Sequence, residues 1–210
     1  MSEDIIKGRD VTLYFDGSKC IHSRNCILDR PDVFVPGVKG DWIHPDNASV
    51  SEIIRIALNC PSGAIRYTLN DNTQPEKAPL VNVIRFRENG PMAIHAETVI
   101  DGQSEGNRLT LCRCGMSGNK PLCDCSHVVS GFRATGEIPV RESCSLEKRD
   151  GLLFITPLKN GPLIIRGCHE LVTGTGKTAE RTGESHLCRC GCSESKPYCD
   201  GSHMLYGFIS

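Results

Sequence analysis

Residues 112–127 read CRCGMSGNKPLCDCSH, and residues 188–203 read CRCGCSESKPYCDGSH. Both follow the pattern C-x-C-x8-C-x3-H, so the chain contains an internal repeat. An Asn-Gly-Pro turn precedes each copy, at residues 89–91 and 160–162. The second copy has five extra residues between this turn and its first cysteine. We expect them in the Gly- and Thr-rich stretch 173–178, and the repeat predicts two units of similar structure.

Each copy offers three cysteines and one histidine, which are soft ligands suited to iron–sulfur clusters or zinc. These residues are Cys112, Cys114, Cys123 and His127 in the first copy, and Cys188, Cys190, Cys199 and His203 in the second. Side chains at i and i+2 point to opposite faces of a strand, so a C-x-C pair needs a tight bend to reach one metal. The glycine after each pair, Gly115 or Gly191, permits that bend. The C-x3-H spacing places its two ligands one helical turn apart.

The repeated pattern resembles the motif of the CDGSH iron–sulfur proteins, C-x-C-x2-[ST]-x3-P-x-C-D-G-[STA]-H. The second copy matches throughout, and the first departs only at Cys125, where glycine is expected. Cysteine tolerates a positive φ poorly, so this departure bears on the backbone geometry at that position. The resemblance implies one [2Fe–2S] cluster per copy, with the C-x-C pair on one iron and the C-x3-H pair on the other. It also implies an internal pseudo-dimer, because the family binds its clusters as homodimers with swapped strands.

The composition favours metal binding in a reducing compartment. The chain has 210 residues and 13 cysteines, with 39% hydrophobic and only 5% aromatic residues, so it has little material for large cores. The N-terminus shows no signal peptide, and no stretch approaches the roughly 18 apolar residues of a membrane span. We therefore expect a cytoplasmic protein without membrane contact, whose clustered cysteines are ligands rather than disulfides. A formal net charge of -1 gives no reason to expect nucleic acid as a partner.

Zinc is the main alternative to a cluster in the two repeats. A C-x-C pair is tighter than the usual zinc spacing, and the matching loop lengths favour a cluster. Four further cysteines of the C-terminal part are expected to be packed or inert thiols, and three further histidines there structural or exposed. These residues are Cys125, Cys144, Cys168, Cys192, His95, His169 and His186.

Apolar, β-branched runs flank each Asn-Gly-Pro turn and predict antiparallel strand pairs. The cysteine stretches read as loops, with a short helix beginning near Asp124 and near Asp200. We predict an α+β chain, mainly β in its C-terminal part, with a small ferredoxin-like α/β domain at the N-terminus. The strand runs are 81–87, 92–100, 152–157 and 163–172, and the predicted domains are 1–74, 75–140 and 141–210.

The N-terminal residues differ from both repeats. Val11–Phe15 alternates like a strand, and residues 64–69 resemble a closing strand. Ser49-Val50-Ser51-Glu52 matches a capping box ahead of an apolar helix face. Residues 70–77 read as a linker.

Three N-terminal cysteines fall on ligand positions of the bacterial ferredoxin pattern, C-x2-C-x2-C with a remote C-P. On this register Cys20, Cys26 and Cys60 are ligands, and Ser23 stands at the second cysteine's place. The segment resembles a divergent single-cluster ferredoxin domain. Three thiolates suit a [3Fe–4S] cluster, or a [4Fe–4S] cluster completed by His22, Ser23 or water. The alternative is a metal-free domain in which these cysteines pack as small hydrophobic residues.

No nucleophile triad, phosphate-binding loop or paired acid/base motif is present, so we predict that the protein is not an enzyme. We expect electron transfer or cluster transfer, with a redox protein or an apo iron–sulfur acceptor protein as partner. We also expect a monomer with an internal pseudo-two-fold. The alternatives are a redox- or pH-sensing interaction scaffold and a zinc-stabilised binding module, and a visible absorption spectrum separates zinc from the others.

Overall fold

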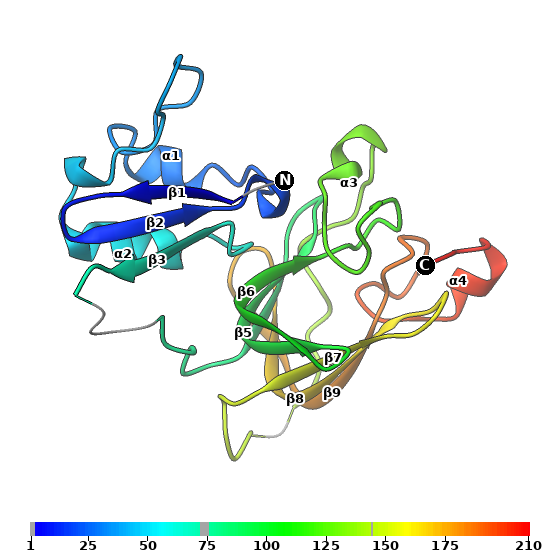
Figure 1. Cartoon of the computed structure of the whole chain (residues 1–210). Helices are drawn as coiled ribbons and strands as arrows, with labels where there is room; N and C mark the ends of the chain where they lie inside the picture. Colours follow the sequence, from blue (N-terminus) through cyan, green and yellow to red (C-terminus); the bar gives the residue numbers. More distant parts are fainter. Residues whose placement is uncertain (1–2, 72–75, 144) are drawn as a thin grey trace. The chain divides into compact units, whose positions relative to one another are not determined.

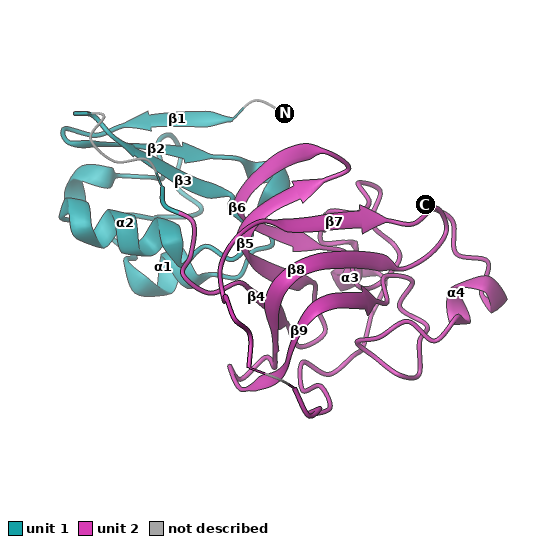
Figure 2. Cartoon of the chain, turned by 90° about the horizontal axis from the view of Figure 1, so that it is seen from below, with its two compact units in different colours: residues 1–77 teal, residues 78–210 magenta. Residues whose placement is uncertain are grey.

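The computed structural model describes residues 3–71, 76–143 and 145–210, and the chain divides into two units, residues 1–77 and 78–210 (Figure 2). Residues 72–75 of the predicted linker, and Cys144, lie outside the described residues. Strands dominate the structure and the helices are few and short, which confirms the predicted mainly β character. Among the described residues, no helix has the length and apolar character to cross a membrane.

Unit 1 contains a three-stranded antiparallel sheet with two short helices on one face (Figure 2). In order across the sheet, its strands are β1 (Asp4–Lys7), β2 (Val11–Phe15) and β3 (Ile65–Leu69). The helices are α1 (Asn25–Asp29) and α2 (Val50–Leu58). The predicted strands correspond to β2 and β3, whereas β1 was not predicted, because most of its side chains are exposed and no apolar alternation marks it.

Helix α2 begins with the predicted capping box. The Ser49 side chain accepts a hydrogen bond from the Glu52 amide, and the Glu52 carboxylate accepts one from the Ser49 amide at 2.9 Å. The inner face of the helix buries Ile53, Ile56 and Ala57 in the core of this unit. Local capping and apolar periodicity therefore agree on where this helix lies.

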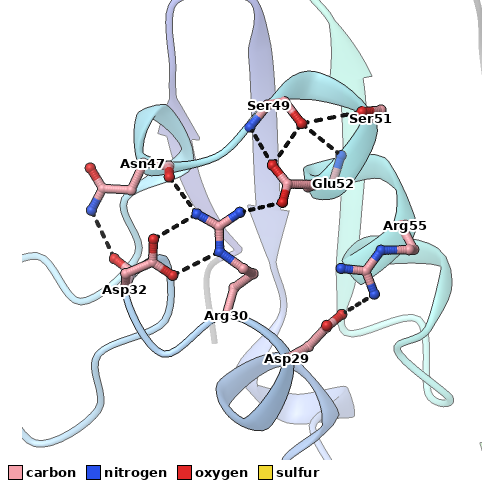
Figure 3. Close-up of polar contacts among 8 residues, drawn as sticks. All are labelled: Asp29, Arg30, Asp32, Asn47, Ser49, Ser51, Glu52 and Arg55. Atoms are coloured by element: carbon pink, nitrogen blue, oxygen red, sulfur yellow. Dashed lines mark hydrogen bonds and ion pairs between the residues drawn. The ribbon is translucent and has the colours of Figure 1, made fainter.

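Ion pairs join the two helices of unit 1 (Figure 3). Arg30, which follows α1, lies 2.6 Å from Asp32 and 2.8 Å from Glu52 of α2. Arg55 of α2 lies 2.6 Å from Asp29 at the end of α1. Partly exposed pairs of this kind contribute little energy singly, but here two of them share Arg30. They fix the relative position of two helices that carry or precede candidate ligands.

Unit 2 is a six-stranded sheet built from both repeats (Figure 1). The first copy supplies β4 (Val83–Phe86), β5 (Met92–Ile100) and β6 (Gln103–Leu111), and the second supplies β7 (Leu153–Pro157), β8 (Leu163–Val172) and β9 (Thr178–Leu187). Consecutive strands within a copy pair antiparallel, and the pairs β4–β5 and β7–β8 confirm the two predicted hairpins. Across copies, β4 pairs parallel with β8, and β5 with β7. The strands β4, β5, β7 and β8 thereby form a closed ring of pairings.

The core of unit 2 takes equivalent residues from both copies. Ile94 and Ile165, at corresponding positions of β5 and β8, are at most 1% exposed and belong to one continuous apolar cluster. Residues 101–102 join β5 to β6, whereas 173–177 join β8 to β9. The five extra residues of the second copy therefore lie in and next to this connection, around the predicted stretch 173–178. Beyond β6 and β9, the cysteine loops lead to α3 (Ser126–Val129) and α4 (Ser202–Leu205) (Figure 1).

Candidate metal centres

The first cysteine loop starts directly after β6 and returns beside that strand. The Cys112 amide donates to the Pro121 carbonyl at 2.8 Å, and the Cys123 amide donates to the Thr110 carbonyl at 2.9 Å. These backbone bonds bring the three cysteines of the loop together. The sulfur atoms of Cys112 and Cys114 lie 3.7 Å apart, and Nδ1 of His127 lies 3.4 Å from the sulfur of Cys123.

The second loop repeats this construction after β9. The Cys188 amide donates to the Pro197 carbonyl at 2.8 Å, and the Cys199 amide donates to the His186 carbonyl at 3.0 Å. The sulfur atoms of Cys188 and Cys190 lie 3.5 Å apart. Nδ1 of His203 is buried and has no hydrogen-bond partner among the described residues.

Backbone amides point at three of the cysteine sulfurs. The amide of Met116 donates to the sulfur of Cys114 at 3.4 Å, and the amide of Cys192 donates to that of Cys190 at the same distance. In the first loop, the amide of Cys125 lies 3.5 Å from the sulfur of Cys123. Hydrogen bonds to the charged form of a group favour that form, so these amides stabilise thiolates.

Burial opposes ionisation of the same thiols while no cation is bound. It raises the pKa of Cys123 to about 12 and that of Cys190 to about 12. Burial also lowers the pKa of His127, which keeps its imidazole neutral and able to ligate. A metal centre supplies the positive charge that buried thiolates need, so binding displaces protons from these sites.

A serine, an aspartate and a lysine brace each loop in the same way. Asp124 accepts hydrogen bonds from the amides of Gly118 at 2.7 Å and Ser126 at 3.0 Å, and Asp200 does the same for Glu194 and Ser202. The expected helix starts near these aspartates are confirmed. The lysine ammonium of each copy donates to the carbonyl of its serine. The serines and lysines are Ser117, Ser193, Lys120 and Lys196.

Sequence reasoning missed the arginine between the first two cysteines of each copy. Arg113 is 2% exposed and donates to four backbone carbonyls, and its guanidinium lies 5.5 Å from the ring of Phe132. Arg189 is 3% exposed, donates to two carbonyls and to Ser210, and lies 5.3 Å from the ring of Phe208. Burial lowers the pKa of Arg113 to about 10. The only sequence signal was the recurrence of C-R-C in both copies.

The two loops meet each other directly. A Cβ on Gly115 would lie 2.5 Å from the carbonyl oxygen of Cys190, and one on Gly191 would lie 2.7 Å from that of Cys114. Both glycines have positive φ, 81° and 83°, as the predicted bends require. The ligand loop of each copy therefore packs against that of the other through a reciprocal contact.

The departure at Cys125 leaves the local backbone unchanged. Cys125 has φ 69°, in the left-handed region that Gly201 also occupies with φ 87°. The following helix begins one residue later in both copies. Surrounding hydrogen bonds thus hold a non-glycine residue in a conformation it adopts rarely.

The three N-terminal cysteines line one cavity in unit 1. Its volume is about 440 Å³, and Cys20, Cys26, Cys60, His22 and Ser23 all contribute to its wall. Apolar side chains complete most of the remainder, among them Phe15, Trp42, Ile27 and Ile65. Burial raises the pKa of the Cys20 and Cys26 thiols.

Two histidines outside these sites are structural or exposed, as predicted. His169 is fully buried and bonded to the Gly167 carbonyl and the Ser185 hydroxyl, while His186 is exposed beside Glu184. Within the described residues, no three His, Cys, Asp or Glu side chains converge closely enough to hold a single metal ion. In the two repeats, the candidate ligands approach one another in pairs: Cys112 with Cys114, Cys123 with His127, and Cys188 with Cys190.

Two family models match this chain. The model described as iron-binding zinc finger CDGSH type covers residues 89–128 and 160–204, which contain all eight repeated cysteines and histidines. The model described as divergent 4Fe-4S mono-cluster covers residues 6–70, which contain the three cysteines of the cavity. This is a CDGSH-type protein with an N-terminal divergent mono-cluster domain. The models support iron–sulfur binding in both units of this CDGSH-type protein.

Curated relatives match part of the CDGSH-type protein. The uncharacterized protein YjdI of Escherichia coli strain K12 is 35% identical over 60 residues, which are 29% of this chain and 78% of YjdI. YjdI of Escherichia coli O157:H7 matches with the same identity and coverage. No solved structure matches the chain.

Proposed function

We propose that this protein binds two [2Fe–2S] clusters and transfers electrons or clusters to partner proteins. Cys112, Cys114, Cys123 and His127 would hold one cluster, and Cys188, Cys190, Cys199 and His203 the other. The observation that carries this proposal is the buried Nδ1 of His203, which has no partner among the described residues. A buried ring nitrogen without a hydrogen bond is costly, and ligation to iron removes that cost.

The pairing of donors supports two irons in each site. Two cysteine sulfurs lie together in each loop, and in the first loop a cysteine sulfur and an imidazole nitrogen form a second pair. When bound, a cluster of this type takes up and releases single electrons. The protein contributes amide hydrogen bonds to the thiolates and a neutral imidazole, and both raise the reduction potential relative to four unassisted thiolates.

The two repeats would form a strand-swapped pseudo-dimer within a monomer. The pairing of β4 with β8 and of β5 with β7 supports this arrangement, because each hairpin joins the sheet of the other copy. The reciprocal contact of Gly115 with Cys190 and of Gly191 with Cys114 is also what an approximate two-fold axis requires. Size-exclusion chromatography with light scattering should give the mass of one chain.

We propose in addition that Cys20, Cys26 and Cys60 hold a third cluster, of the [3Fe–4S] or [4Fe–4S] type. Their position on one cavity wall supports this assignment. The partner would be a redox protein or an apo iron–sulfur acceptor, the setting the cytoplasm, and the protein would have no substrate chemistry of its own.

Iron and acid-labile sulfide counts on anaerobically purified protein test the proposal. Two [2Fe–2S] clusters require about four irons per chain, and a third cluster raises this to about seven or eight. Zinc without visible absorption would contradict it and favour the binding module instead. Rapid reduction by a ferredoxin reductase would indicate electron transfer, and delivery of the cluster to an apo-ferredoxin would indicate cluster transfer.

Histidine ligation also predicts acid sensitivity. Protons compete with iron for an imidazole, so we expect cluster loss to accelerate as pH falls to about 5–6. His203→Cys should slow this loss at the second site, because a thiolate bound to iron is harder to protonate. Stopped-flow absorbance after a pH jump measures the rate, with His186→Cys as a matched exposed control. Equal bleaching of His203→Cys and the parent would argue against ligation by His203.

A further inference from the structure

We infer that His22 is the fourth protein ligand of the N-terminal cluster, which makes that site a three-cysteine, one-histidine [4Fe–4S] centre. This inference rests on the proposed third cluster and extends it. It concerns the position at which the C-x2-C-x2-C register places Ser23 instead of a cysteine. Three thiolates leave one corner of a four-iron cluster without a protein ligand, so the identity of the fourth group decides how stable that corner is.

The geometry of the loop favours His22. Its Nδ1 lies 3.8 Å from the sulfur of Cys20, close to the 3.7 Å that separates the sulfurs of the Cys112–Cys114 pair. His22 lines the same cavity as the three cysteines and is exposed at its edge. Its side chain therefore reaches the space that the thiols surround without having to leave a packed core.

The backbone around His22 adopts an uncommon conformation. His22 has φ 52° and Arg24 has φ 64°, so two residues between Cys20 and Cys26 adopt left-handed conformations. Non-glycine residues rarely occupy this region, and it concentrates at functional sites. In a segment with these two turns, Cys20, His22 and Cys26 all line the same cavity.

The two serines near the site are weaker candidates. The hydroxyl of Ser62 lies 3.7 Å from the sulfur of Cys60, but it also accepts a hydrogen bond from the Ala64 amide, so it stabilises the turn after Cys60. Ser23 lines the cavity, but a neutral hydroxyl is a poor ligand for iron in a cluster. An imidazole, by contrast, replaces cysteine in known iron–sulfur centres.

The test compares the full-length parent with His22→Asn, His22→Cys and Ser23→Ala after anaerobic cluster reconstitution. Asparagine tolerates positive φ and lacks an imidazole, so it removes the ligand while preserving the turn. Each sample receives a stoichiometric amount of ferricyanide, and EPR then measures the [3Fe–4S]⁺ signal that appears when the fourth iron is lost. A four-ligated cluster stays EPR-silent under this treatment.

We expect His22→Asn to yield about tenfold more [3Fe–4S]⁺ signal than the parent, because an unligated corner loses its iron readily. Ser23→Ala and His22→Cys should resemble the parent, and His22→Cys should lower the reduction potential of this cluster. Equal signals in His22→Asn and the parent would overturn the inference. So would a parent that contains only about four irons, all in two-iron clusters, although the two repeat sites would then stand. The parent could also lack the spectrum of [2Fe–2S] clusters and still show the difference in [3Fe–4S]⁺ signal between His22→Asn and the parent. That result would overturn the function proposed for the repeats and support this inference.

Discussion

Arg113 and Arg189 show how a single buried side chain organises each cysteine loop. The guanidinium of Arg113 gathers the carbonyls of Arg87, Gly90, Ala134 and Thr135, which belong to segments on both sides of the loop. A guanidinium has five donors spread over three nitrogens and can serve four carbonyls, whereas an ammonium has three donors on one nitrogen. The arginine thereby ties the start of the loop to the turn before β5 and to the chain after α3.

Arg113→Lys should consequently lower the free energy of unfolding by about 2 kcal/mol or more, because several buried carbonyls lose their donor. Chemical denaturation followed by circular dichroism measures the change. Arg133→Lys is the matched control, since Arg133 is exposed and donates to one neighbouring carbonyl, that of Phe132, at 3.3 Å. A change of less than about 0.5 kcal/mol in both variants would contradict the assigned role.

The glycines at the contact between the loops lead to a second prediction at this scale. Gly115→Ala and Gly191→Ala should each destabilise unit 2 by about 2 kcal/mol or more, since each adds both a clash with a backbone carbonyl and a left-handed penalty. Gly118→Ala in the same loop is the control, because its nearest neighbour would be a side-chain oxygen 3.6 Å away. Melting temperatures of the cluster-loaded proteins test this, and three equal values would refute it.

At the level of elements, helix α2 combines a cap with an interhelical ion pair. The Glu52 carboxylate accepts hydrogen bonds from the side chain and amide of Ser49 and pairs with Arg30 (Figure 3). The Ser49 hydrogen bonds are the main cause that lowers the pKa of Glu52 to about 2. The fold therefore favours the charged form of Glu52, whose ion pair with Arg30 couples α2 to the residue following α1.

This lowered pKa makes the stability of unit 1 depend on pH in a defined direction. A carboxyl with a folded pKa of about 2, below its ordinary 4.5, stabilises the fold above about pH 4.5 and loses that effect as pH falls toward 2. Glu52→Gln should melt below the parent at neutral pH, and the difference should shrink near pH 3. Circular dichroism melts of unit 1 within the full chain measure both gaps. A gap that stays constant across this range would exclude the ionised carboxylate as its source.

Sequence patterns located the elements whose signals are local. The capping box before α2, the hairpins around the two Asn-Gly-Pro turns and the helix starts near Asp124 and Asp200 all follow from residues close together in the chain. Strands β1, β6 and β9 were missed. Polar and glycine residues interrupt their alternation, and pairing with a neighbouring strand decides their conformation.

The residues of the candidate sites also fall into those that a local sequence pattern marks and those whose roles depend on distant contacts. The repeated motif marked the eight residues of unit 2 directly, whereas the roles of Arg113 and Gly115 depend on partners more than 20 residues away. The cavity that unites Cys20 and Cys60 likewise forms only when β3 closes beside β2. Contacts between distant parts of a chain leave no periodic signal in its sequence.

For the molecule as a whole, the ring of strand pairings makes the two repeats one folding unit. Strands of each copy pair with strands of the other, and one apolar cluster contains residues of both. Ile94→Ala and Ile165→Ala, at equivalent buried positions, should each cost about 2–5 kcal/mol and release both clusters in one transition. Visible absorbance and far-UV circular dichroism during one melt test this, with the exposed Val129→Ala as control. Separate release of the two clusters would show that the copies unfold independently.

The reciprocal packing of Gly115 on Cys190 and of Gly191 on Cys114 has a consequence for how such a chain diverges. Elsewhere in the loops the two copies tolerate different residues, as at Cys125, Leu122 and Met116 relative to their counterparts. Gly115 and Gly191 do not allow such differences, because a methyl group on either one would displace the backbone of the other copy. A side chain introduced at either of these two positions therefore disturbs both cysteine loops at once.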